Sequence, residues 1–305
     1  MTLNFHGISP LNHLGVIRAE GEDAVKFLHG QLTHDFALLD MGHARLTAFL
    51  SAKGRMQASF IGFKRSPTEV LLVCSRDLLG PTLKRLSMFV MRAKAKLTDA
   101  TAEVQLYGLA GDAIESVAGG ALPAWSKAEF GAQTVIHLPP AAGQARALWV
   151  APVGEQVPSG PALDPALWAW GEVQSGVATL SAPLVDAFVP QMLNYESVDG
   201  VSFKKGCYPG QEVVARSQFR GAIKRRAYLV HADAELAVGA DVFALADPGQ
   251  PCGTVVQAAP APAGGWDALV SLQISAAQQG ALHAGSIDGP ALTLGTLPYP
   301  LREDI

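Results

Sequence analysis

The chain of 305 residues is 49% hydrophobic and 16% charged, and its formal net charge is −4 at pH 7. This composition excludes a disordered protein and is enough for two or three packed units, because single cores stop growing near roughly 250 to 300 residues. The three cysteines are far apart and form no CxxC pair, which argues against a disulfide framework. The N-terminus lacks a signal-peptide pattern, and no stretch approaches the roughly 18 apolar residues that span a membrane. We therefore expect a cytoplasmic protein with no membrane partner.

The first hundred residues predict an α+β unit. A strand over 14–17 is followed by Gly21 and by apolar residues at the spacing of one helix face, namely Ala24, Phe27, Leu28 and Leu32. Two more strands are expected over 56–63 and 70–74. Asp77 is the expected N-cap of a second helix with Leu79, Leu83, Leu86 and Val90 on one face. A short strand over 93–97 would close the unit.

The same pattern then begins again. Strands are expected over 104–109, 134–138 and 147–150, and Gly111 opens a helix as Gly21 does. Asp164 and Pro165 are a favourable N-cap and first residue for another helix. Because Gly111 lies 90 residues after Gly21, we expect two related ferredoxin-like (split βαβ) units, about 1–100 and 101–180.

The rest of the chain divides into a long loop and a β-rich end. Residues 181–203 show no clear period, and a loop of this length in a compact protein is usually functional. After Arg226, five short strands predict a small antiparallel barrel or sandwich; they cover 227–231, 241–246, 253–257, 268–274 and 291–297, with a hairpin loop at 260–265. The predicted fold class is therefore α+β, with an α+β region over 1–221, which includes the loop segment 181–221, and a C-terminal antiparallel β-barrel over 222–305.

The segment from Lys204 to Arg226 stands out by its charge. It carries seven basic residues and one acid, Glu212, in a chain that is negative overall. A solvated surface would explain such a run, but the concentration of charge around glycine and tyrosine favours an anionic partner. A polycarboxylate, a phosphate or an RNA backbone would suit it.

Cys207, between Gly206 and Gly210, is the sharpest candidate for chemistry. Lys204, Lys205 and Arg216 could stabilise its thiolate. A small cysteine packed in a tight turn is the alternative, and both interpretations stay open, because no general base is visible in the sequence. Dinucleotide, P-loop, hydrolase and zincin motifs are absent, and the eight scattered histidines predict no metal site.

The run Lys205-Gly206-Cys207-Tyr208-Pro209-Gly210-Gln211-Glu212 strongly resembles the signature of the YgfZ family of folate-binding proteins, K-G-C-Y-x-G-Q-E followed by an arginine. Four other segments look like landmarks of that family in the expected order: 27–33 (FLHGQLT), 53–55 (KGR), 188–191 (FVPQ) and 201–203 (VSF). The resemblance thus extends along nearly the whole chain.

The resemblance implies a fold shared with the aminomethyltransferase of the glycine cleavage system, with tetrahydrofolate or a one-carbon derivative bound in a central hole. It implies a supporting role for iron-sulfur enzymes, including those that thiolate tRNA, as protein clients; direct contact with tRNA stays open. Cys207 would be a functional thiol at the mouth of the folate cavity. The implied folate-binding residues are Lys205, Gly206, Tyr208, Gly210, Gln211, Glu212, Arg216 and Arg220.

Two departures bear on whether the protein is an enzyme. The aminomethyltransferases carry a catalytic aspartate on the strand that corresponds to Gly54 onward, and residues 54–59 here contain no carboxylate. The relatives also often carry R-L-E-x-G late in the second unit, where this chain reads EVQSG from Glu172 to Gly176. A classical aminomethyltransferase is therefore not expected; a folate-dependent one-carbon transferase with shifted catalytic groups and an RNA-binding module remain the alternatives.

Overall fold

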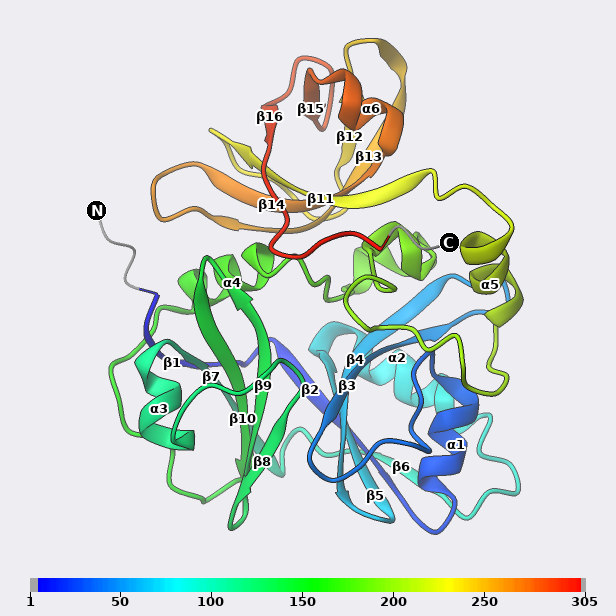
Figure 1. The fold of residues 1–305 in the computed structure, drawn as a ribbon, viewed down its shortest axis with the longest axis vertical. Coiled ribbons are helices and arrows are strands. Elements are labelled where there is room, and N and C mark those ends of the chain that lie inside the picture. The colour runs from blue at the N-terminus through cyan, green and yellow to red at the C-terminus, as the bar shows by residue number, and fades with distance from the viewer. Residues whose placement is uncertain (1–4, 303–305) are drawn as a thin grey trace.

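Three β-structures make up the protein. The computed structural model describes residues 5–302, which form two five-stranded sheets and a closed barrel (Figure 1). The two sheets stand side by side, and the barrel lies across one end of both (Figure 1). Within residues 5–302, no helix is long and apolar enough to cross a membrane.

The first sheet has the strand order β3-β4-β5-β2-β6, and every pairing in it is antiparallel. Two helices, α1 (Ala24–Gln31) and α2 (Arg76–Ser87), pack against β2 and β5. The part β6-β2-β5-β4 has the order of a split βαβ unit, to which β3 adds an edge strand. The strands are β2 (Leu14–Glu20), β3 (Ala44–Leu50), β4 (Met56–Ser66), β5 (Glu69–Ser75) and β6 (Lys96–Asp99).

The second sheet repeats this plan with the order β1-β7-β10-β9-β8. Its strands are β1 (Gly7–Pro10), β7 (Val104–Ala110), β8 (Lys127–Phe130), β9 (Gln133–Ala141) and β10 (Gln144–Pro152), and its helices are α3 (Asp112–Ala118) and α4 (Pro165–Gln174). Strand β1 pairs with β7 as β6 pairs with β2. The N-terminal strand therefore completes the second sheet, although the sequence pattern groups residues 1–100 together.

The closed barrel follows, with the order β11-β14-β13-β12-β15-β16. It comprises β11 (Arg225–Ala232), β12 (Asp241–Ala244), β13 (Asp247–Pro260), β14 (Trp266–Gln273), α6 (Ile274–Gln279), β15 (Leu282–Ala284) and β16 (Ala291–Leu294). The α+β class with a C-terminal antiparallel barrel is thus confirmed. Five of these elements were not predicted from the sequence, namely β1, β3, β8, β15 and α6.

Several local predictions need correction. Ser75, and not Asp77, is the N-cap residue of α2; Asp77 instead accepts hydrogen bonds from the Ser75 hydroxyl at 2.7 Å and from the Ala182 amide at 2.9 Å. The helix ends at Ser87, so Val90 lies outside it, and the closing strand begins at Lys96. The expected loop segment 181–221 contains two 3-10 turns, η1 (Ala182–Leu184) and η2 (Pro190–Leu193), and a helix, α5 (Gln211–Phe219).

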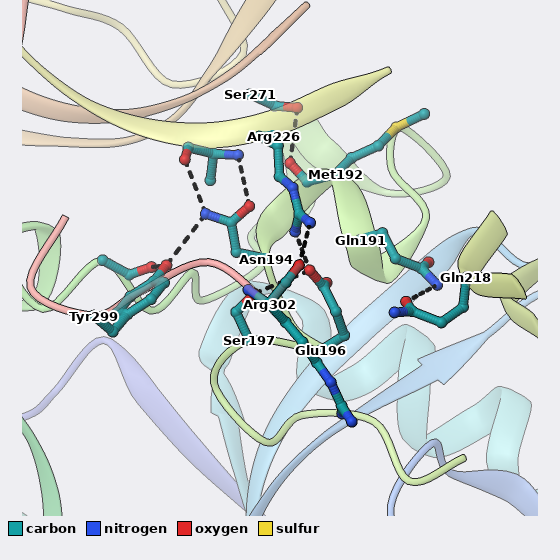
Figure 2. A network of polar contacts seen from close by, with 12 residues as sticks. Gln191, Met192, Asn194, Glu196, Ser197, Gln218, Arg226, Ser271, Tyr299 and Arg302 are labelled. Carbon is teal, nitrogen blue, oxygen red and sulfur yellow. Dashed lines mark hydrogen bonds and ion pairs between the residues drawn. The ribbon is translucent and has the colours of Figure 1, made fainter. Parts of the chain in front are cut away.

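A buried polar network joins the segment after η2 to the barrel (Figure 2). The Asn194 side chain donates to the Ala227 carbonyl at 2.9 Å and accepts from the Ala227 amide at 3.1 Å. It also lies 3.3 Å from the hydroxyl of Tyr299, which donates to the Gly176 carbonyl at 2.7 Å. One asparagine therefore connects β11 with the C-terminal tail.

Next to it, Arg226 of β11 forms an ion pair with Glu196 (Figure 2). Both side chains are almost fully buried, and the second Arg226 terminal nitrogen donates to the Arg302 carbonyl at 3.2 Å. A buried pair of this kind contributes little net stability, but losing one partner leaves an uncompensated charge in the interior.

We expect Arg226→Met to lower the free energy of unfolding by about 3 to 5 kcal/mol, because Glu196 loses its partner. Urea denaturation followed by tryptophan fluorescence measures this. Arg225→Met is the matched control, since Arg225 is half-buried and donates to one carbonyl, that of Cys252. Equal midpoints for the two variants would contradict the assigned role of the ion pair.

Candidate functional site

The signature segment lies where the four other family landmarks meet. The Thr33 hydroxyl donates to the Gly200 carbonyl at 2.7 Å, and the Ser202 amide donates to the Thr33 carbonyl at 2.9 Å. The Gln191 side chain donates to the Val214 carbonyl of α5 at 2.8 Å. Segments spaced over nearly two hundred residues of chain thus converge on the stretch around Cys207.

Two glycines allow the closest of these approaches. Gly210 has φ of +79°, and a β-carbon there would stand 2.5 Å from the Ser51 carbonyl oxygen and 2.7 Å from the Gly54 α-carbon. Gly54, in the β3–β4 turn, has φ of +71° and would clash with Val213 in the same way. Because side chains rarely adopt these angles and no space exists for one, glycine is required at both positions.

Lys205 fixes the segment to the C-terminal end of α1. Its ammonium donates to the carbonyl of His29 and, at 2.6 Å, to that of Leu32, and it lies 4.6 Å from the centre of the Tyr208 ring. The last carbonyls of a helix lack partners and carry its negative dipole end, so a buried cation is favourable there. Lys205 and Tyr208 are therefore the buried residues that anchor the loop.

The remaining predicted residues lie on the outside. Cys207 is exposed, whereas Cys74 and Cys252 are buried. Burial and the nearby carboxylates of Asp77 and Asp99 raise the pKa of Cys74 to about 12. On α5, Gln211 is half-buried, the exposed side chains of Glu212 and Arg216 form an ion pair, and Arg220 is exposed. Gly206 and Gly210 complete the loop.

A separate cavity lies between the two sheets. Its volume is about 40 Å³, and its walls come from β2, β3, β4 and β5 on one side and from β9, β10 and α4 on the other. Among the described residues, its lining includes none between Lys204 and Arg226 and only one carboxylate, Glu172. The signature segment thus does not line this cavity, and the folate-binding role that the resemblance implies for its eight residues stays a prediction.

Two side chains of α4, Trp168 and Glu172, line this cavity, and Arg146 of β10 lies beside Trp168 without lining it. Trp168 and Glu172 lie four residues apart on one face of α4, and the Trp168 ring packs directly on Gly108. The indole nitrogen of Trp168 and one terminal nitrogen of Arg146 are buried without a hydrogen-bond partner among the described residues. Arg146 lies 5.2 Å from the Trp168 ring, and burial, opposed by Glu172, lowers the pKa of Arg146 to about 10.

Glu172 also faces His13, whose ring nitrogen lies 3.4 Å from the carboxylate. Burial opposes the charge of His13, but the hydrogen bond to Glu172 and its negative charge raise the pKa of His13. Glu172 was not predicted as a site residue, because the carboxylate of the R-L-E-x-G pattern aligns with Gln174. The structure turns Gln174 toward the barrel, where it donates to Asp267 at 2.7 Å.

A second cavity lies next to this one. Leu11 and Leu14 line both the cavity between the sheets and this neighbour of about 160 Å³, whose polar lining includes Arg76, Gln105 and Tyr107. A ligand with a flat polar head and an anionic tail would match this order of groups. The inner cavity holds little more than the roughly 30 Å³ of one water molecule, so a bicyclic ring enters only if the lining side chains move outward.

The fold defines the class of the protein. The structure matches a crystal structure of the glycine cleavage system aminomethyltransferase T from Bartonella henselae with a TM-score of 0.72. The match covers 96% of this chain and 86% of that one at 16% sequence identity, so it shows the shared fold. The protein is therefore an aminomethyltransferase-fold protein that carries a signature cysteine loop.

Sequence relatives give the family. A tRNA-modifying protein YgfZ from Serratia proteamaculans is 30% identical over 228 residues, covering 72% of this chain and 68% of its own. Another from Sodalis glossinidius is 28% identical over 306 residues, covering 96% and 93%. An uncharacterized protein from Haemophilus influenzae is 30% identical over 76% of both chains. No model of a known protein family matches, but with these relatives the chain belongs to the YgfZ family.

The glycine requirement at residue 210 gives a stability prediction. We expect Gly210→Ala to lower the free energy of unfolding by about 1 to 3 kcal/mol, because the new β-carbon meets backbone at a strained angle. Gly206→Ala is the control, since its β-carbon would meet only the His29 ring, at 3.7 Å. Thermal denaturation of both variants measures the difference, and equal losses would contradict the packing described.

The burial of Lys205 gives a pH prediction. Burial, opposed by Asp35 and Cys207, lowers the pKa of Lys205 from 10.5 to about 8. Between these values the folded chain binds fewer protons than the unfolded chain, so folding becomes more favourable as the pH rises. We expect the denaturation midpoint of the wild type to rise relative to that of Lys205→Met from pH 8 to 10. Curves that stay parallel would mean that Lys205 titrates normally.

Proposed function

We propose that the protein binds tetrahydrofolate or a one-carbon derivative in the cavity between the sheets and thereby supports tRNA modification. The observation that carries this is Glu172, the one carboxylate that lines this mainly apolar cavity among the described residues, beside the Trp168 ring. A carboxylate accepts a pair of hydrogen bonds from neighbouring N–H groups, the pattern that a pterin edge presents, and an aromatic ring stacks on flat heterocycles. Relatives named tRNA-modifying proteins support the second half of the proposal.

The chain's own residues would orient the ligand. Glu172 would accept hydrogen bonds from the pterin, while the unpartnered indole nitrogen of Trp168 would donate one to the pterin oxygen or to a ring nitrogen. Arg76, in the outer cavity, would pair with a carboxylate of the glutamate tail. Folate would supply a one-carbon group or act as the sensed ligand.

The cavity does not favour aminomethyl transfer. The β4 wall of the cavity presents Ser59, whose hydroxyl accepts a hydrogen bond from the Leu180 amide at 2.8 Å, in place of a carboxylate. A carboxylate that could pair with a reacting amine is therefore missing from that strand.

Tetrahydrofolate titration under anaerobic conditions tests the binding. We expect saturable quenching of tryptophan fluorescence in the wild type and an at least tenfold weaker affinity in Glu172→Gln, because a hydrogen bond to a charged group contributes about 1.5 to 3 kcal/mol. Glu22→Gln is the control, since Glu22 is exposed and pairs with Lys94. No saturable binding at millimolar ligand, or equal affinity in both variants, would contradict the proposal.

We further propose that the supported clients are iron-sulfur enzymes, including those that thiolate tRNA, and that Cys207 is needed for this support. Its exposure, together with the rigid loop that presents it, supports the idea. Complementation of a strain that lacks the family member tests it. We expect Cys207→Ala to fold normally and to fail to restore client activity; full rescue would reduce Cys207 to a surface residue.

Direct binding of RNA is a second candidate that a specific observation favours. Phe219 of α5 is 59% exposed and packs edge-to-face on Phe203, with exposed Arg216 and Arg220 on the same helix end. Exposed aromatic rings beside cations suit unpaired bases and phosphates. Phosphate-driven binding weakens steeply with salt, so affinity for an RNA hairpin that is unchanged between about 50 and 200 mM salt would exclude it.

A further inference from the structure

A histidine far from Cys207 in the sequence lies beside the loop that carries Cys207. His29, on α1, and Asp35, in the loop after it, are both partly buried, and the His29 Nδ1 atom lies 3.1 Å from Asp35 Oδ1. On the opposite edge of the ring, Nε2 would stand 3.7 Å from a β-carbon at Gly206. The free edge of the imidazole therefore faces the backbone beside Cys207.

Lys205 holds the loop close to His29. Its ammonium donates to the backbone carbonyl of His29 itself, so the residue before Gly206 is bound directly to the residue that carries the imidazole. Two residues span at most about 7 Å of chain, which keeps the exposed Cys207 close to that anchor. Glycine at 206 leaves the space between ring and loop open, because no side chain stands there.

The Asp35 carboxylate is itself held in place. It accepts a hydrogen bond from the Leu38 amide at 2.9 Å. Burial opposes its charge, but this hydrogen bond and the neighbouring His29 keep the pKa of Asp35 below its usual value. The Ala37 amide lies 3.4 Å from His29 Nδ1, a weaker approach than that of Asp35. The closer carboxylate favours a proton on Nδ1 and leaves Nε2 as an acceptor.

We propose that His29, positioned by Asp35, is the general base for Cys207, and that the three residues form a thiol-exchange site for disulfide-type substrates. The charged and titratable groups that the described contacts bring to the cluster are Asp35, His29, Lys205 and Cys207, with the Tyr208 ring next to Lys205 and His34 next to Asp35. His34 Nδ1 accepts a hydrogen bond from the Asp35 amide at 2.7 Å. The inference shares Cys207 with the proposed function but does not depend on folate binding.

The exchange step balances without a further reactant. The Cys207 thiol gives its proton to His29 Nε2, and the thiolate attacks one sulfur of a disulfide R–S–S–R. A new sulfur–sulfur bond forms to Cys207 as the substrate bond breaks, and the leaving thiolate takes the proton from His29. Attack by a thiolate through a mixed disulfide is the general course of such reactions, and a neighbouring imidazole is a common means of forming the thiolate.

The pH dependence of Cys207 alkylation tests the role of His29. The rate with iodoacetamide is followed on the peptide that contains Cys207 by mass spectrometry, between pH 5 and 9. We expect wild-type reactivity to persist at pH 6 to 7, and His29→Gln to react about tenfold more slowly there and to recover toward the ordinary range of thiol ionisation near pH 8.5. Asp35→Asn should fall between the two.

His43→Gln is the matched control, because His43 forms a similar pair with Asp40 at 2.7 Å on an exposed turn. It should keep the wild-type profile. The same proteins are then treated with an aromatic disulfide whose released thiolate absorbs visible light, and the ranking of rates should be the same.

Three outcomes would overturn the proposal. One is an identical pH profile in the wild type and His29→Gln, and another is a slowing in His43→Gln as large as in His29→Gln. The third outcome needs no variant and therefore does not depend on the folding of one. If the alkylation rate of wild-type Cys207 shows a single rise near pH 8.5 and no reactivity below pH 7, a base at His29 is excluded. Tetrahydrofolate affinity, measured on the same variants, keeps this result separate from that of the folate proposal.

Discussion

The position of the signature segment depends on one buried ammonium group. Lys205 reaches the unpartnered carbonyls at the end of α1 and thereby joins residues that lie 173 and 176 positions away in the chain. Its desolvation is costly, and the helix dipole and two charge-assisted hydrogen bonds offset part of that cost. With the loop held there, Gly210 can meet Gly54, and Cys207 is presented to solvent on a rigid base.

The second constraint is that the signature segment and the cavity between the sheets lie in different parts of the fold. The ferredoxin-like repeat places two similar sheets side by side, and the cavity between them takes its carboxylate from α4 and its walls from both sheets. The barrel secures this arrangement through Asn194 and the Arg226 ion pair. Ligand recognition by Glu172 and thiol chemistry at Cys207 would therefore occupy separate places, coupled through the first sheet and α1.

Much of the fold could be predicted from the sequence, because Gly21 and Gly111 mark the repeat and Asp164 caps its helix through the Ala166 amide at 2.8 Å. The antiparallel β-structure at the C-terminal end could be predicted from short strands between turn residues. The strand β1, its pairing with β7 and the start of β6 could not be predicted, because strand pairing depends on residues that lie far apart in the chain. Asp77 failed as a cap because its carboxylate bonds with Ser75 and Ala182 instead.

The candidate site was predicted only in part. A signature pattern identifies Cys207 but is silent on His29, whose relation to Gly206 exists only after α1 and the loop have docked.

The central claim is that the folate cavity and the thiol are distinct sites on one scaffold. The most direct measurement is the affinity of Cys207→Ala for tetrahydrofolate, determined beside the wild type by isothermal titration calorimetry. The account predicts equal dissociation constants, because no residue from Lys204 to Arg226 lines the described cavity. A loss of tenfold or more in the alanine variant would show that Cys207 belongs to the folate site and would contradict the account.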